Sequence, residues 1–211
     1  MPVAADNCDV TLTPVKTAGS FIPGACPEEG TYTNTWTVTD CAGNVSAVYT
    51  QVITIEDTQA PTWTTAAGAL DVTLQCSDAA GLATAQSQAP VATDNCDATL
   101  TPVKTAGSFV AGACPEEGTY TNTWIVTDCA GNVSAVYTQV ITIEDTQAPT
   151  WTTAAGALNV TLQCSDAAGL ATAQSQAPVA TDNCDATLTP VKTAGSFIPG
   201  TCPEEGTYTN T

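Results

Sequence analysis

The stretch "TIEDTQAPTW" occupies residues 54–63 and recurs, letter for letter, at residues 142–151. In each copy a β-branched run ends at two acidic residues, and a proline follows shortly after them. Proline has no backbone N–H to donate to a β-ladder, so each copy is expected to end a strand and open a linker. The two copies therefore predict boundaries between structural units after residues 57 and 145.

The sequence around these linkers repeats with a period of 88 residues. Cys8, Cys96 and Cys184 are spaced by this period, and residues 6–123 align on residues 94–211 with eight mismatches. A period of this length is too long for a solenoid coil and suits one small domain per repeat. We expect an excerpt of a longer array, divided into the end of one repeat (1–57), one complete repeat (58–145) and the beginning of the next (146–211).

Each repeat contains several patterns typical of strands. "LDVTLQC" (70–76) and "TYTNTWIVTD" (119–128) alternate apolar and polar residues, and "VSAVYTQVITIE" (133–144) is rich in β-branched residues. An alanine-rich segment, 77–90, is compatible with a helical turn. About seven short strands separated by turn residues predict an all-β fold, namely tandem β-sandwich repeats of about 88 residues.

Composition excludes several classes of function. The chain has 21 acidic residues, three lysines, no arginine and no histidine. Phosphate recognition and docking on anionic lipid both need basic residues, so no nucleic-acid partner is expected. No apolar run approaches the roughly 20 residues of a membrane span, so no membrane insertion of this segment is expected. Without histidine neither a Ser-His-Asp nor a Cys-His site can be built, and we expect no enzyme.

The ten cysteines are expected to form disulfides, because no CxxC pair or histidine points to zinc. Disulfides place the protein in an oxidising, extracellular setting. If successive strands alternate in direction, two cysteines of a repeat lie at each end of the sandwich. Of the three possible connectivities this favours Cys76–Cys114 and Cys96–Cys129, and by repetition it includes Cys8 and Cys41.

The motifs "TLQC", "ATDNCD", "TNTWTVTDCAGN" and "TQVITIEDTQAPTW" resemble the four-cysteine form of the hyalin-repeat-like (HYR-like) modules of bacterial surface proteins. The resemblance covers the whole chain. It implies an immunoglobulin-like sandwich used in tandem in long secreted adhesins and filaments, which are frequent in Bacteroidota-type bacteria. Such modules generally extend or adhere and are not catalysts. The repeats here are almost identical, which favours a uniform fibre.

The clustered acidic residues are candidates for binding Ca²⁺, which accepts six to eight oxygen ligands in loose geometry. One candidate site joins the acids of each linker to Asp residues of the next repeat, and it resembles the linker calcium of cadherin-type arrays. The other places Asp94, Asn95, Asp97 and Asp128 around one end of a repeat. The alternative is a solvated acidic surface in which these residues cap turns. The candidate ligands are Glu56, Asp57, Asp94, Asp97, Asp128, Glu144, Asp145, Asp182 and Asp185.

The sequence thus predicts a structural repeat of an extracellular bacterial filament or adhesin stalk, whose partners are neighbouring repeats of its own chain and other copies of the fibre. Two alternatives remain open. One is a module that binds a glycan or protein partner through its threonine-rich strands and through Trp63 and Trp151, which otherwise pack the linker. The other is a subunit that assembles laterally into a sheath or fibre.

Overall fold

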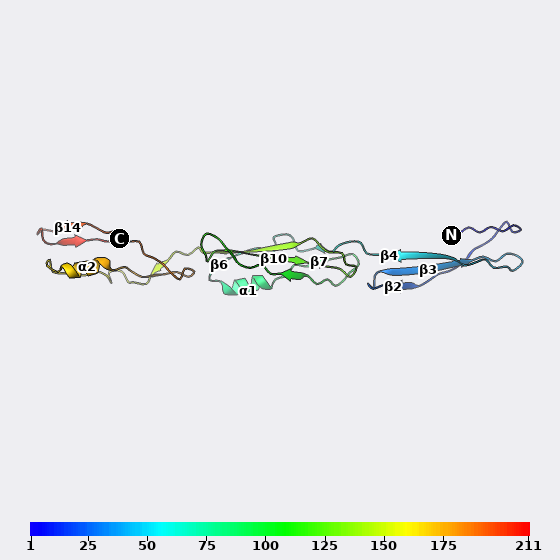
Figure 1. The fold of residues 1–211 in the computed structure, drawn as a ribbon, viewed down its shortest axis with the longest axis horizontal. Coiled ribbons are helices and arrows are strands. Elements are labelled where there is room, and N and C mark those ends of the chain that lie inside the picture. The colour runs from blue at the N-terminus through cyan, green and yellow to red at the C-terminus, as the bar shows by residue number, and fades with distance from the viewer. The chain divides into compact units, whose positions relative to one another are not determined.

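The computed structural model describes residues 1–211, and most of its elements are short β-strands, as expected (Figure 1). Residues 1–57 contain β1 (Val15–Thr17), β2 (Phe21–Pro23), β3 (Gly30–Thr37) and β4 (Tyr49–Ile55). Residues 58–145 contain β5 (Thr62–Trp63), β6 (Val72–Gln75), α1 (Ala79–Ser87), β7 (Ala92–Thr93), β8 (Val103–Thr105), β9 (Val110–Ala111), β10 (Gly118–Ile125) and β11 (Tyr137–Glu144). Residues 146–211 contain β12 (Thr150–Trp151), α2 (Ala167–Ser175), β13 (Ala180–Thr181), β14 (Phe197–Pro199) and β15 (Gly206–Tyr208).

The strands form several sheets. In the first repeat, β1, β2 and β4 all pair antiparallel with β3. In the second repeat, a five-stranded sheet has the order β6-β11-β10-β8, with β9 also paired to β10. Strand β6 runs parallel to β11, with Ile141 opposite Val72, while β8 and β9 run antiparallel to β10. Separate two-stranded ladders join β5 to β7, β12 to β13, and β14 to β15.

The alternation of side chains along the strands agrees with the sequence pattern. On β10, Trp124 is 2% exposed and Ile125 is 40% exposed. On β11, Ile141 and Ile143 are buried and form the core with Ala85 of α1. The partly buried residues around this core are Val72, Leu74, Cys76, Leu82, Phe109 and Tyr120. The predicted inward face of residues 70–76 therefore contacts the core.

Segment 77–90, which the sequence indicates is compatible with a helical turn, contains the nine-residue helix α1. Its sequence recurs in α2, where Asp166 caps the first turn by accepting a hydrogen bond from the backbone N of Gly169 at 2.8 Å. A Cβ at Gly169 would lie against the Asp166 carboxylate, so a larger residue there would require that side chain to shift. No helix in the structure has the length and apolarity needed to cross a membrane.

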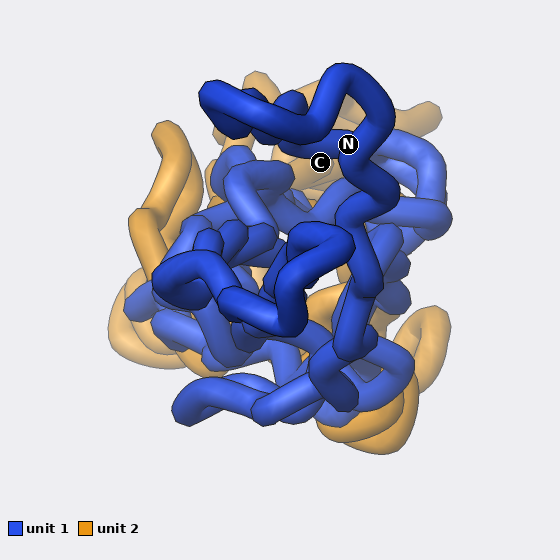
Figure 2. Tube along the Cα trace, turned by 90° about the vertical axis from the view of Figure 1, so that its right-hand side faces the viewer, with its two compact units in different colours: residues 1–71, 87–108, 121–140 blue, residues 72–86, 109–120, 141–211 orange.

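The chain divides into two compact units, coloured separately in Figure 2. The first comprises residues 1–71, 87–108 and 121–140, and the second comprises residues 72–86, 109–120 and 141–211. Each unit contains segments from more than one repeat, together with one copy of the "EDTQAP" linker. The boundaries after residues 57 and 145 remain predictions. We call the surroundings of Asp57 the first junction and those of Asp145 the second junction.

Candidate metal centre

The turn "DNCD" supplies one side of each junction. At residues 94–97 the Asp94 Oδ1 atom accepts hydrogen bonds from the backbone N of Cys96 (2.9 Å) and of Asp97 (3.1 Å). These bonds, first that from Cys96, hold the pKa of Asp94 below its ordinary value. One carboxylate oxygen thus closes the turn. The other, Oδ2, is buried and has no hydrogen-bond partner.

Asp57 supplies the other side of the first junction. It is 8% exposed and lies two residues beyond the end of β4. Its backbone N donates to Glu29 Oε1 at 2.8 Å, and its backbone O accepts from Asn132 Nδ2 at 3.2 Å. The Oδ1 atom accepts from the backbone N of Gln59 at 3.1 Å, and the buried Oδ2 has no partner. The backbone of Asp57 is therefore fixed by side chains from the repeats on both sides of the linker.

Two further carboxylates are fixed by the loop that follows β10. Asp128, 7% exposed, accepts from the backbone N of Asn132 at 2.7 Å and from its Nδ2 at 2.9 Å. Asp97 Oδ2 accepts from the backbone N of Cys129 at 2.6 Å. The loop turns at Gly131, whose φ of +95° is a conformation that side chains with a Cβ rarely adopt. Both carboxylates are thereby directed toward Asp94.

The four carboxylates converge. One oxygen from each of Asp57, Asp94, Asp97 and Asp128 lies within 4.8 Å of all the others. A hard cation with oxygen ligands at about 2.3–2.6 Å can bridge oxygens at such separations. The Oδ2 atoms of Asp57 and Asp94 are buried and accept no hydrogen bond, as expected for oxygens that bind a cation. The residues present therefore fit Ca²⁺ better than a softer metal, which prefers thiolate or imidazole.

The second junction repeats part of this arrangement. The Asp145 backbone N donates to Glu117 Oε1 at 3.1 Å, and the turn at Asp182 is closed by the backbone N of Cys184 at 2.9 Å. That bond is the first cause of the lowered pKa of Asp182, and the buried Asp182 Oδ2 has no partner. The pKa of Asp185 is raised by desolvation and then by the charge of Glu116. Repulsion between carboxylates is thus present at this junction as well.

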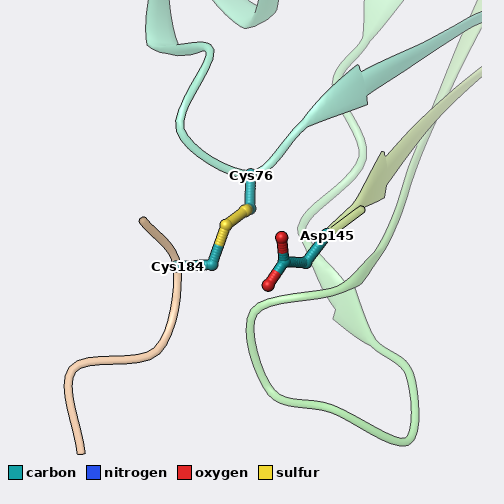
Figure 3. Close-up of side chains that lie close together, drawn as sticks. All are labelled: Cys76, Asp145 and Cys184. Atoms are coloured by element: carbon teal, nitrogen blue, oxygen red, sulfur yellow. A yellow bond between two sulfur atoms is a disulfide. The ribbon is translucent and has the colours of Figure 1, made fainter. Parts of the chain in front are cut away.

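A disulfide lies beside the acids of the second junction. Figure 3 shows the carboxylate of Asp145 next to the bond between Cys76 and Cys184, whose Cα atoms are 5.9 Å apart. The sulfurs and a carboxylate oxygen of Asp145 lie within 4.8 Å of one another. At the first junction the counterpart thiol, Cys96, is free, and burial and then the charge of Asp57 raise its pKa.

The structure merges the two predicted metal sites into one. The first alternative paired linker acids with the next repeat, and the second grouped residues around Asp128. In the structure Asp57 of the linker joins the second group. Glu56 and Glu144 are exposed and belong to no such cluster. Whether any of these residues binds a metal stays a prediction.

Glu29 and Glu117 are members of the junctions that the sequence reasoning missed. Each accepts a hydrogen bond from the linker aspartate of its own repeat. The motif "CPEEG", repeated at 26–30 and 114–118, could have indicated these glutamates, because it places Glu29 and Glu117 three residues after a cysteine.

The predicted cysteine pairing is wrong. The structure bonds Cys26 to Cys129, with Cα atoms 5.7 Å apart, and Cys76 to Cys184. Neither Cys76–Cys114 nor Cys96–Cys129 forms, and Cys8 and Cys41 are free and exposed. Cys76 lies within 4.8 Å of Asp145, and the charge of Glu117, the largest cause, raises the pKa of Cys114. Each disulfide reaches across a junction to the neighbouring repeat instead of closing one end of its own repeat.

Trp63 does not pack the linker as expected. Its Nε1 donates to the backbone O of Ala135 at 2.7 Å, and its ring meets Tyr137 edge-on with centroids 5.5 Å apart. Both partners belong to the same repeat as Trp63. This tryptophan therefore packs within its own repeat, and Tyr137 covers part of its indole ring.

A family model described as an HYR-like domain with 4 cysteines matches residues 1–55 and 64–143, which is more than half of the chain. The chain belongs to this family. No curated protein matches it, and no solved structure matches it. HYR-like domains are typically extracellular immunoglobulin-like modules and form no known catalytic family, in agreement with the β-rich structure and its two disulfides.

Proposed function

We propose that this chain is part of a tandem array of immunoglobulin-like sandwiches of about 88 residues in a long extracellular bacterial filament or adhesin stalk, with Ca²⁺ bound at each junction. The observation that carries the proposal is the buried Asp57, which belongs to the cluster with Asp94, Asp97 and Asp128 and whose Oδ2 has no hydrogen-bond partner. The near-identity of the repeats and the family's usual role support a mechanical task. Its partners are neighbouring repeats and other copies of the fibre.

The role of the cation follows from electrostatics. Four carboxylates within 4.8 Å repel one another when they are ionised, and burial weakens the screening by water. A divalent cation replaces this repulsion with attraction to every ligand. Because Asp57 belongs to the linker and the other three to the following repeat, the same ion restricts motion between successive repeats. Without it, the linker aspartate is expected to move away from the cluster.

Calcium binding is tested on the whole chain by isothermal titration and by thermal unfolding in Ca²⁺ or EDTA. We expect one tight site, at the first junction, because residues 1–211 contain a counterpart of Asp128 for that junction only. Ca²⁺ at 100 times its Kd adds about 2.7 kcal/mol to the free energy of unfolding. Asp57→Asn is expected to weaken Ca²⁺ binding at least tenfold. Glu56→Gln removes the same charge one residue away, at an exposed position, and is expected to leave binding unchanged.

The mechanical part is tested by small-angle X-ray scattering of the same chain in Ca²⁺ and in EDTA. A stiff particle in Ca²⁺ that becomes flexible in EDTA, with Asp57→Asn flexible in both, supports a calcium-locked stalk. Titration heats that are absent at millimolar Ca²⁺, or equal for Asp57→Asn and Glu56→Gln, overturn the metal site. A chain that is mobile in both conditions overturns the stalk.

A further inference from the structure

The two disulfides obey one rule when they are expressed in repeat positions. In the complete repeat, Cys76, Cys96, Cys114 and Cys129 are the first, second, third and fourth cysteines. Cys26 is a third cysteine, and it bonds to the fourth cysteine of the following repeat over a separation of 103 residues. Cys184 is a second cysteine, bonded to the first cysteine of the preceding repeat over 108 residues. Both bonds therefore join successive repeats.

Each junction contains one of these two bonds and one cysteine of the other, which is a free thiol. At the first junction the third–fourth bond is formed, and Cys96 is the free second cysteine. At the second junction the first–second bond is formed, and Cys114 is the free third cysteine. By the same separations, the partner of Cys96 would stand 108 residues before it, and that of Cys114 would stand 103 residues after it. Both positions fall outside residues 1–211.

Cys96 is held in the same way as its bonded counterpart. Its backbone N donates to Asp94 Oδ1 at 2.9 Å, and Asn95 Nδ2 lies 2.9 Å from its sulfur. Around Cys184 the corresponding distances are 2.9 Å and 3.0 Å. The turn that presents the bonded sulfur is thus already formed around the free one.

Cys114 likewise matches the bonded Cys26. The backbone O of each accepts from the N of the glutamate three residues later, Glu117 or Glu29, at 3.1 Å. The flanking glycines close the same loop in both copies, at 2.7 Å. Only burial differs, because Cys26 is 4% exposed and Cys114 is exposed. Cys114 lacks only the cover that the fourth cysteine's loop provides for Cys26.

We propose that every junction of the array carries two disulfides and that no repeat contains one of its own. Cys96 and Cys114 form the bonding surfaces for further copies of the repeat: Cys96 takes the first cysteine of a preceding copy, and Cys114 takes the fourth cysteine of a following copy. Each bond forms from two thiols, whose two protons and two electrons pass to a small-molecule disulfide such as oxidised glutathione, which is reduced to two thiols. The proposal does not depend on calcium.

The test compares the chain with a version lengthened by one period at each end, a copy of residues 1–88 before Met1 and a copy of residues 124–211 after Thr211. Both are oxidised with glutathione, and their thiols are counted under denaturing conditions. The 211-residue chain should have six thiols. The added segments bring eight cysteines, yet the rule again leaves six thiols, because four more bonds form. Pairing within repeats would leave about two thiols in the shorter chain.

Peptide mapping without reduction identifies the bonds. Differences between repeats mark most cysteine peptides, such as Thr37 against Ile125 and Asp71 against Asn159. The peptides of Cys96 and Cys184 are alike, so Ala186→Val is introduced as a mass marker, since Val10 stands naturally at that repeat position. Cys114→Ser should leave both bonds of the shorter chain intact and remove one from the longer chain, while Cys26→Ser removes one from each.

Two results overturn the proposal. One is a bond within a repeat, Cys76–Cys114 or Cys96–Cys129, in the lengthened chain. The other is Cys96 or Cys114 remaining a free thiol there, although the copies that should supply their partners are present.

Discussion

Identical segments adopt different structures in two regions of the chain. Val-Thr-Leu-Gln at 72–75 forms β6, whereas the same residues at 160–163 form no strand. Strand β6 pairs with β11, and residues 146–211 contain no counterpart of β11. The segment therefore does not become a strand by its own propensity. Its partner strand and the core beneath it determine its structure.

The burial of β11 likewise depends on the segments that pack against it. β11 has alternating buried residues, whereas its counterpart β4 is exposed along its whole length. Ile141 is 0% exposed, and its counterpart Ile53 is 38% exposed. The difference arises from β6 and α1, which supply Val72, Leu82 and Ala85 to the core around β11 and have no counterparts on β4. In residues 58–145, β6 and α1 thus cover the face of β11 that β4 leaves exposed.

The largest expected effect concerns the cysteine that follows each copy of the Val-Thr-Leu-Gln segment. Cys76→Ser opens a loop of 108 residues and is expected to lower the free energy of unfolding by about 4 kcal/mol. Cys164→Ser changes a free, exposed thiol and should have almost no effect. Urea unfolding under oxidising conditions measures both. Equal effects would show that the 76–184 bond does not hold β6 in place.

A core truncation tests the covered strand itself. Ile141→Ala removes a fully buried side chain and should cost about 3 kcal/mol, because a cavity remains between β11 and α1. Ile53→Ala is the matched control at the uncovered copy and should cost less than about 1 kcal/mol. The measurement is urea unfolding followed by tryptophan fluorescence. If the two variants lose the same stability, β4 is covered in solution.

A buried polar group gives a smaller, more specific difference. Gln139 is 0% exposed, donates to the backbone O of Leu70 at 2.8 Å and accepts from Asn122 Nδ2 at 3.0 Å. Gln139→Leu removes both of these hydrogen bonds from the interior and should cost about 2 kcal/mol. Gln51→Leu, at the exposed counterpart, removes only the hydrogen bond that Gln51 accepts from Asn34 Nδ2 at 3.3 Å and should cost less, about 1 kcal/mol. Hydrogen exchange of the Asn122 backbone amide should accelerate only in the first variant.

The two "DNCD" turns should not differ in this way between a complete and an incomplete repeat. Each turn is closed by hydrogen bonds from its own backbone to Asp94 or Asp182. The pKa values of Asp94 and Asp182 are both lowered from 3.8, first by the N–H of the cysteine two residues later. A depressed pKa contributes stability that is present above the unfolded value and lost as the pH falls through the folded value. In EDTA, NMR titration should find both carboxyls ionising below pH 3.8. A normal value at Asp182 alone would mean that this turn also depends on the rest of its repeat.

The sequence predicts what is local and repeated. Alternation correctly assigned Trp124 to the interior and Ile125 to the exterior, because the two faces of a strand differ in polarity at every step. Of the linker acids expected to face the next repeat, Asp57 lies in one cluster with Asp94 and Asp97, whereas Glu56 belongs to no cluster. The orientation of successive repeats was not encoded in any local pattern, so the bonds across the junctions were missed. Asp128 was placed in a separate site for the same reason.

The overlap of the two disulfides changes how the chain responds to cutting and to tension. Any backbone break between residues 76 and 129 is spanned by both bonds, so a protease that nicks an exposed loop there leaves one covalent molecule. Under tension, three routes connect Cys26 to Cys184, because one bond joins Cys26 to Cys129 and the other joins Cys76 to Cys184. They run along the 50 residues from Cys26 to Cys76, the 53 residues between Cys76 and Cys129, or the 55 residues from Cys129 to Cys184. Each route extends to about 170–190 Å, against more than about 500 Å for the 158 residues of uncrosslinked chain. The three routes are nearly equal in length, so they share the load and no single segment of the chain carries all of it.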